Sequence, residues 1–549
     1  MPTTQTRNKH TLSSPPTDNP ATQLLDNIAA ERRQPTPSEI SLIRGFVDDT
    51  QRNLDSLNAR VRRSTTTVYG KKPTPGLRAK LDEARRLMPR LRDALVSRPV
   101  HKLPAEVLME IFLDIIESHE PDIKVGWDAN TLQACCLAQV CASWRNVALV
   151  TRRLWNVVAI TLRYRSPARG TLTEVATLLE RSANAPLFVS LGCDLPIIDA
   201  KKVKSILELV APHASRLVGL RTSFAGMFSF ATLAVPIEIS QTIGRIVAEA
   251  PNLQRLWWET ERGNFENPTF SLQLSGIEKS GAPLKQLYIQ SSGMGSSTRY
   301  PKSLAFLTDL VLISHIAISS LFGILATAPV LETLSLSEIN DDSHVPALTL
   351  KSMRVLRFGD TSNRAVSAFL GAVSLPALKT LHIPQVLRVD GVIVDLQQAI
   401  SNFFARSQCT LQRLFLGEGR AGEQVLSEQD MVSLLKHHAC RALVDLSIQL
   451  ARPTSFCLDT VLQHLVFDAE QNHFPIPQLI YLTLRGIDVA LAGRLQDMVR
   501  SRLAPPPGQR KLRILRAHFG RRAAHEEIHL LRTIAKEYSG FKLKVDSEE

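Results

Sequence analysis

Three short clusters in this 549-residue chain carry side chains that could bind a phosphate or a metal ion. They are residues 293–297 (Gly-Met-Gly-Ser-Ser), the group His437, His438 and Cys440, and the group Cys135, Cys136 and Cys141. No Lys-Ser or Lys-Thr pair follows the glycines, as a phosphate-binding loop requires. Neither cysteine-containing group has the second pair of ligands that a zinc site needs. We therefore expect the glycine-rich segment to be a surface loop, the histidine group to lie at a helix end and the cysteine group to lie in a core. We expect no catalytic residues, no metal and no cofactor.

Side chains suited to recognition are more prominent, and they recur beside pairs of leucines in the second half of the chain. In a strand, successive side chains point to opposite faces, so the leucines are expected inside and their neighbours outside. Trp, Tyr and Arg are the residue types that most often anchor interfaces. We expect a protein target of unknown identity to bind the outward positions. The strongest candidates are Arg255, Trp257, Tyr288, Arg357, Arg413, Phe415, Tyr481 and Arg485, with Gln286, Ser335, His382 and Asp445 at equivalent positions.

The leucines belong to an array. The pattern Leu-x-x-Leu-x-(apolar) begins at Leu253, Leu284, Leu307 and Leu331, and continues to Leu512 with steps of 22 to 36 residues. Helical stretches separate the copies, and a strand plus a helix at such a period is typical of a solenoid. The array resembles an irregular leucine-rich repeat, which implies an α/β solenoid over residues 180–520, followed by a C-terminal helix and charged tail over 521–549. An unrelated α/β domain with leucine-rich strands is the alternative.

A dense apolar segment precedes the array. Leu103 and Pro104 are suited to the start of a helix. The apolar residues that follow have spacings of three and four, as one face of a helix does. A polar break over 119–130 should loop out, and a second apolar helical face is expected over 132–144, with a third short helix after it. About 50 residues in short helices bury little surface alone, so the segment is either a helical mini-core or a docking module. The first helical face comprises Val107, Leu108, Ile111, Phe112 and Ile115.

This segment resembles the F-box. Its ordered motifs are Leu-Pro-x-Glu-(apolar)-Leu-x-x-Ile-Phe from Leu103, Val-Cys-x-x-Trp-Arg from Val140, and Leu-Trp at Leu154. The resemblance implies a three-helix F-box-like domain within 99–165 that docks a Skp-family adaptor of a cullin–RING ubiquitin ligase. It places Leu103, Pro104, Val107, Ile111, Val140, Trp144 and Trp155 at or beneath that interface. The long insert departs from the family pattern.

The N-terminal region is expected to be a disordered tail over 1–35 followed by a helical hairpin over 36–98. Thr36-Pro37-Ser38-Glu39 is a capping box with proline at the first helical position. The breaker Lys72-Pro73-Thr74-Pro75-Gly76 separates two apolar stripes, and a dimeric coiled coil is the alternative to an antiparallel pair. Residues 1–100 carry 18 Lys and Arg against 10 Asp and Glu. Solvated helix faces explain this excess better than a nucleic-acid surface, because aromatic residues are almost absent nearby.

Composition limits the class of protein further. Hydrophobic content is 44% and the formal net charge is +13. No apolar run approaches the length of a membrane span, so no membrane is expected among the partners. Seven scattered cysteines favour a reducing compartment, the cytoplasm or nucleus. The combined expectation is a substrate receptor of a Skp–cullin–F-box ligase. A non-catalytic scaffold and a nucleic-acid-associated protein that uses the basic hairpin remain alternatives.

Overall fold

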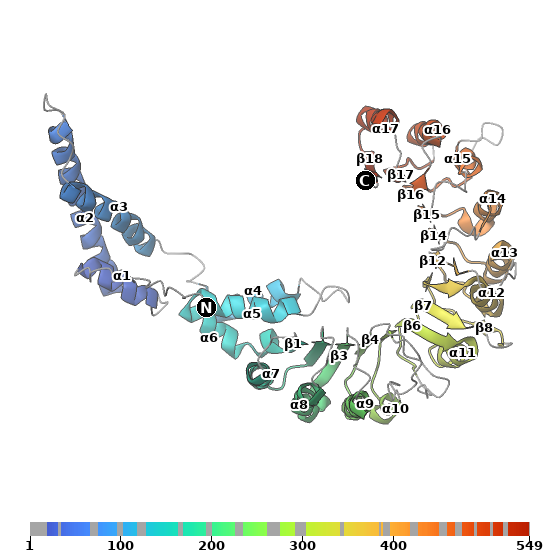
Figure 1. Ribbon diagram of the computed structural model, residues 1–549, viewed down its shortest axis with the longest axis horizontal. Coiled ribbons are helices and arrows are strands. Elements are labelled where there is room, and N and C mark those ends of the chain that lie inside the picture. The colour runs from blue at the N-terminus through green and yellow to red at the C-terminus, as the bar shows by residue number, and fades with distance from the viewer. Residues whose placement is uncertain are drawn as a thin grey trace, which may run out of the picture. The chain divides into compact units, whose positions relative to one another are not determined.

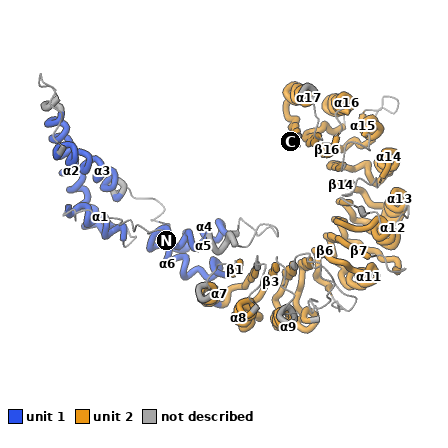
Figure 2. Tube along the Cα trace, viewed as in Figure 1, with its two compact units in different colours: residues 1–156, 181–183 blue, residues 157–180, 184–549 orange. Residues whose placement is uncertain are grey.

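The computed structural model divides the chain into two compact units, which we describe separately. Unit 1 comprises residues 1–156 and 181–183, and unit 2 comprises 157–180 and 184–549 (Figure 2). Within them the structure describes residues 19–30, 35–65, 75–95, 103–117, 128–162, 168–193, 200–224, 234–260, 275–290, 304–340, 345–383, 386–387, 396–417, 426–449, 458–466, 475–487, 491–505, 509–519 and 525–547. The glycine-rich segment 293–297 and most of the expected insert, residues 119–127, lie outside these ranges.

Unit 1 contains a helical hairpin. Helix α2 spans Pro37–Thr65 and α3 spans Pro75–Leu95 (Figure 1). The capping box is present: the Thr36 N–H donates to Glu39 Oε2 at 2.7 Å, and the Glu39 N–H donates to Thr36 Oγ1 at 3.3 Å. Leu54, Leu81 and Met88 form one buried cluster between the two helices. Their apolar stripes therefore pack on each other within one chain.

The predicted disordered tail is wrong over residues 20–30, which form helix α1 (Pro20–Ala30). Asn19 caps this helix, because its Oδ1 accepts from the Ala21 N–H at 3.0 Å, and Pro20 occupies the first helical position. Leu25 and Ile28 are buried in a cluster that also holds residues of α2 and α3. A short helix of this length is marginal alone, so packing on the hairpin stabilises it.

The dense apolar segment forms three helices and a 3₁₀ turn: α4 (Ala105–Glu117), α5 (Asp128–Val140), α6 (Ala142–Val150) and η2 (Arg152–Trp155). The single helical face expected over 132–144 is therefore wrong, because the chain breaks at Cys141. Cys141 adopts an extended backbone and its Sγ accepts from the Trp144 N–H at 3.4 Å. It acts as an N-cap that ends one helix and starts the next.

Unit 2 is an α/β structure built on a parallel sheet, which confirms the predicted α/β class. Among the described residues, 14 strands lie side by side in sequence order, and every neighbouring pair is parallel. The strands are β1 (Val157–Leu162), β2 (Leu187–Cys193), β3 (Leu217–Phe224), β4 (Arg255–Thr260), β5 (Gln286–Gln290), β6 (Asp309–Ala317), β7 (Thr333–Asn340), β9 (Val355–Phe358), β12 (Thr380–Ile383), β14 (Arg413–Gly417), β15 (Asp445–Gln449), β16 (Tyr481–Ile487), β17 (Ile514–Phe519) and β18 (Lys542–Ser547). Two small pairs stand apart: β8 (Leu348–Thr349) with β11 (Val373–Ser374), and β10 (Thr361–Ser362) with β13 (Val386–Leu387).

Helices connect most of these strands and lie on the outer side of the curved sheet, so that the strands line its inner side (Figure 1). The repeated leucines face the helices and are buried, as Leu334, Leu414 and Leu482 are. The side chains that alternate with them form the inner face. The helices are α7 (Ala168–Ser182), α8 (Ala200–Val210), η3 (Ala211–Arg216), α9 (Ala234–Ala248), α10 (Ser275–Ser280), α11 (Ile318–Ala326), α12 (Asn363–Ala372), α13 (Leu396–Ser407), α14 (Glu428–Lys436), η4 (His438–Cys440), α15 (Asp459–Leu465), α16 (Ala492–Leu503) and α17 (His525–Glu537).

The sheet extends beyond the predicted limits of 180 and 520 at both ends. Strand β1 starts at Val157, inside the segment assigned to the F-box-like domain, because residues 157–162 are mostly β-branched. The predicted charged tail contains β18, in which Leu543 and Val545 alternate with lysines. Lysines on an edge strand discourage pairing with another chain. The array therefore ends in a strand that suits a sheet edge.

Three arginines fasten successive elements of unit 2 to each other. Arg216 donates to the carbonyls of Leu179 and Ala185, and Arg406 donates to those of Leu370 and Val373. Arg502 donates to Leu465 O and Ile476 O. In each case one acceptor lies in the last turn of an earlier helix (α7, α12 or α15), where carbonyls lack a partner within the helix. The arginines therefore cap the C-terminal ends of these helices from η3, α13 and α16, which follow later in the chain.

Candidate functional site

Helix α4 presents a row of exposed apolar side chains. Val107, Ile111 and Ile115 are 42%, 38% and 37% exposed, and they lie one turn apart. We call these three residues the α4 stripe. On the adjacent side of the same helix, Leu108 and Phe112 are 1% and 0% exposed. The apolar face that the sequence predicts is thus wider than the core needs, and one edge of it stays in contact with solvent.

The other residues expected at the adaptor interface divide between surface and core. Pro104 is exposed and Leu103 is half-buried, while Val140, at the end of α5, is 54% exposed. Trp144 is half-buried, with its ring centroid 4.9 Å from that of Phe112. Trp155 is 1% exposed and its Nε1–H donates to Ala148 O at 2.7 Å. Trp155 therefore supports the fold and lies beneath any surface.

The sequence-based site omitted three exposed apolar residues of this segment. Ile115 belongs to the α4 stripe, and Leu149 and Val150 at the end of α6 are 38% and 75% exposed. Ile115 was detectable, since it continues the four-residue spacing of Val107 and Ile111. Val150 was not, because its exposure depends on where α6 ends.

On the inner face of unit 2, strand register aligns side chains that are far apart in the sequence. Trp257 pairs with Tyr288, Ser335 with Arg357, and His382 with both Arg357 and Phe415. We call the complete line of such positions the central row. It runs through Ala159, Ser190, Arg221, Trp257, Tyr288, Val311, Ser335, Arg357, His382, Phe415, Ser447, Thr483, Arg516 and Lys544.

The remaining predicted target-binding residues lie on neighbouring rows of the same face. Arg255 pairs with Gln286 on one such row. Further along it, Asp445 pairs with both Arg413 and Tyr481. Arg485 lies two residues beyond the central row on β16. The structure thus brings all of these positions onto one face. Arg221 and Arg516 were missed, although aligning the repeats at their leucines would have identified them.

The first half of the central row contains a stacked cluster. The rings of Trp257 and Tyr288 lie 4.0 Å apart at 25°, and the Arg221 guanidinium lies 4.8 Å from the Trp257 centroid. Arg221 Nη2 also lies 3.6 Å from Glu259 Oε2. Burial, with the Glu259 charge as a smaller contribution, raises the pKa of Tyr288 to about 12. The cluster thus consists of a neutral Tyr288, the Trp257 ring and Arg221, whose charge is paired with Glu259. Such a cluster suits contact with a partner better than proton transfer.

The second half of the central row contains Arg357, His382 and Phe415. The rings of His382 and Phe415 meet edge to face, 4.3 Å apart at 74°. Burial, with the nearby Arg357 charge as a smaller contribution, lowers the pKa of His382 to about 4. His382 is therefore neutral at pH 7, and Arg357 supplies the charge at this place.

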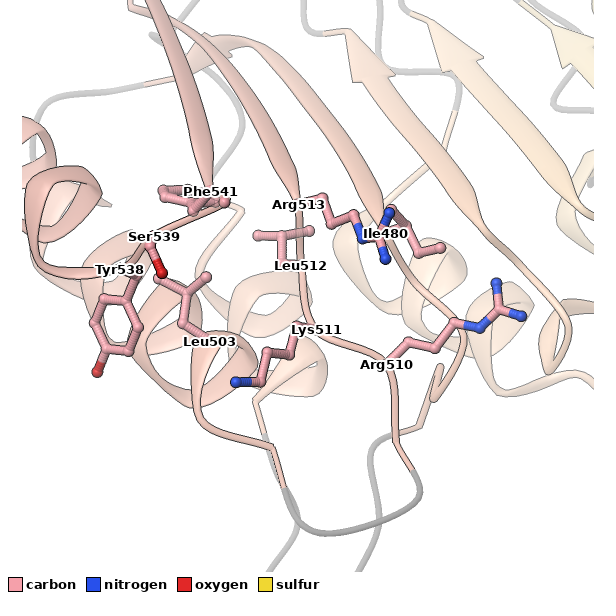
Figure 3. A pocket seen from close by; sticks show the side chains of 10 residues that line it. Ile480, Leu503, Arg510, Lys511, Leu512, Arg513, Tyr538, Ser539 and Phe541 are labelled. Atoms are coloured by element: carbon pink, nitrogen blue, oxygen red, sulfur yellow. The ribbon is translucent and has the colours of Figure 1, made fainter.

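A hollow of ≈ 790 Å³ lies at the C-terminal end of unit 2, and Figure 3 shows its lining. Leu503, Leu512 and Phe541 provide apolar walls, and Arg510, Lys511 and Arg513 provide cations. Tyr538 and Ser539 add hydroxyl groups. Among the described residues that line it there is no carboxylate or imidazole.

Within the part of the chain that the structure describes, no group of His, Cys, Asp and Glu could hold a metal ion. His437 accepts from the Ala439 N–H through Nδ1, and its ring packs against Phe404 and His438. This places the histidine cluster at the end of α14, as expected. Cys141, from the cysteine group, is the N-cap of α6.

No described helix has both the length and the apolar character to cross a membrane.

A comparison with protein-family models finds no match to this chain, and a comparison with curated proteins finds none either.

Proposed function

We propose that this chain is the substrate-receptor subunit of a Skp–cullin–F-box ubiquitin ligase. One observation carries the proposal: the α4 stripe is exposed on the helix that follows the Leu103-Pro104 motif. Exposed apolar side chains gathered on short helices mark an interaction site, because monomeric proteins keep such patches small. The F-box-like module would dock a Skp-family adaptor through the stripe, Pro104 and Val140.

Unit 2 is, in this proposal, an irregular leucine-rich-repeat-like solenoid that holds the target on its inner face. The sequential parallel strands and the aligned Trp, Tyr and Arg side chains support this. The chain itself performs no chemistry. It holds adaptor and target at once, which raises the concentration of the target near the ubiquitin donor.

The test is adaptor binding by the full chain. We expect Val107→Glu with Ile111→Glu to weaken binding to a purified Skp-family adaptor at least about 100-fold, which corresponds to about 2.7 kcal/mol. Each carboxylate would have to lose its hydration to enter an apolar interface. The affinity is measured by isothermal titration or surface plasmon resonance.

The matched control is Leu42→Glu with Leu530→Glu, two large apolar side chains that are 55% and 42% exposed on α2 and α17. It adds the same charge away from the α4 stripe. Equal affinity of the stripe variant and the unmodified chain would contradict the docking proposal, and so would an equal loss in the control. A different outcome is that the chain binds the adaptor while the levels of the proteins that it captures stay constant when the chain is depleted. That result would favour the scaffold alternative.

A further inference from the structure

The inner face of unit 2 changes its charge along the sheet. On strands β3–β6, the strand-paired residues of this face include two cations, Arg221 and Arg255, and two carboxylates, Glu259 and Asp309. Their charges balance. Arg221 and Glu259 also form an ion pair at 3.6 Å. The cations of this half are thus compensated by carboxylates on the same face.

On strands β9–β17 the same face is cationic. Arg357, Arg413, Arg485 and Arg516 alternate with buried side chains and are exposed. None of the four forms an ion pair or a side-chain hydrogen bond in the described part of the chain. Among the described inner positions of these strands there is one carboxylate, Asp445, and it is half-buried. One carboxylate for four guanidiniums leaves a net positive surface.

The pKa of Asp445 reflects this field. Burial raises it, whereas the charges of Arg413, on the neighbouring strand β14, and of Arg516, on β17 two strands away, lower it. Both guanidiniums therefore act on one partly desolvated carboxylate, which cannot neutralise both. A ligand that brings further carboxylates to this place would be attracted by the remaining charge.

We propose that this half of the inner face binds an extended, carboxylate-rich segment of the target protein. The proposal rests on the proposed function, since it gives the chemistry of the target that unit 2 would hold. Strands β9 and β17 are five strand spacings apart in the sheet order. This amounts to about 24 Å, which an extended segment of about seven residues covers. Guanidinium groups suit this role because their fork matches the two oxygens of a carboxylate.

A nucleic-acid strand fits the surface less well. Single strands are held by aromatic rings on which bases stack. In this half of the face, His382 and Phe415 are half-buried and meet edge to face at 74°, so each ring covers part of the other. Tyr481 is the one aromatic side chain described on this half of the face that is exposed, so the surface offers several cations but no row of rings for successive bases.

The probe for the test is a dye-labelled peptide of about ten residues with alternating glutamate and serine, long enough to cover the span. We expect the full chain to bind it at least about tenfold more tightly than the matching glutamine–serine peptide at low ionic strength, with the preference fading as salt is added. Arg413→Glu with Arg516→Glu should reduce that affinity about tenfold or more. Fluorescence anisotropy measures both.

The matched control is Lys436→Glu with Arg500→Glu, which makes the same charge change at exposed positions of α14 and α16 on the outer side. Equal binding of the acidic and neutral peptides, or an equal loss in this control, would overturn the proposal. A single-stranded oligonucleotide of the same charge that binds more tightly, and loses affinity in the same inner-face variant, would assign the surface to nucleic acid instead. Adaptor affinity, measured on the same variants, should not change, which separates failure of this proposal from failure of adaptor docking.

Discussion

Replacing Arg502 with alanine is expected to lower the free energy of unfolding of the C-terminal part of unit 2 by about 3–5 kcal/mol. Arg502 is 0% exposed, its Nε donates to Leu465 O at 2.7 Å, and its Nη1 donates to Ile476 O at 2.6 Å. Without the guanidinium, both carbonyls lose these donors and a large buried volume empties. Few other single changes in this unit remove so much at once.

The buried charge of Arg502 is sustained by its acceptors. Burial lowers the pKa of the guanidinium to about 9, so it stays protonated at neutral pH. Leu465 is the last residue of α15, where the helix dipole places partial negative charge. A cation at this position is therefore stabilised by the helix end that it caps.

The measurement combines urea denaturation with hydrogen exchange, because one part of a large unit can open locally before the whole unit unfolds. Exchange should rise most in α15, α16 and β16. Arg500→Ala, an exposed change on the same helix, should stay within about 0.5 kcal/mol of the unmodified chain. Arg502→Lys should fall between them, since one ammonium cannot reproduce the fork. Equal stability of the two alanine variants would show that the bridging hydrogen bonds contribute little.

The second large effect is expected at Trp155. Trp155→Ala should destabilise the α4–α6 module by about 3–5 kcal/mol, because it empties the space of the largest side chain in a small core. A module of about 50 residues has little stability to lose, so we expect it to unfold locally and, if the proposed function holds, to lose adaptor binding. Hydrogen exchange of α4, α5 and α6 gives the readout.

Two further variants separate packing from hydrogen bonding. Trp155→Phe retains a ring but loses the Nε1–H donated to Ala148 O, and should cost about 1–2 kcal/mol. Arg152→Ala, an exposed change in the same 3₁₀ turn, should have little effect. Unchanged exchange of α4–α6 in Trp155→Ala would mean that this tryptophan does not hold the module together.

These two residues illustrate the limits of sequence reasoning in different ways. The Leu-Trp motif drew attention to Trp155, but its assignment to an interface or to the core required the contact with Ala148. Arg502 carried no sequence signal, since an arginine near a helix end is ordinarily solvated. Its acceptors lie 26 and 37 residues earlier in the chain, and no local pattern shows that helix packing would enclose it.

The class of the fold was determined by the sequence alone. Leucines at alternating strand positions and apolar residues at helical spacing are local properties, and they imply parallel strands joined by helices wherever the array is found. Local chemistry also specified the capping box at Thr36, whereas the helix over residues 20–30 was overlooked.

The tertiary structure decided which of these residues meet and which remain exposed. It divides the apolar face of residues 105–116 into a buried edge and the α4 stripe, because the small core accommodates only part of it. It also aligns Arg357, Arg413 and Arg516 on neighbouring rows of one face, although about 160 residues separate the first from the last. Periodicity is set by neighbours in the chain, whereas register and burial depend on contacts between distant segments, and the sequence pattern does not encode those contacts one by one.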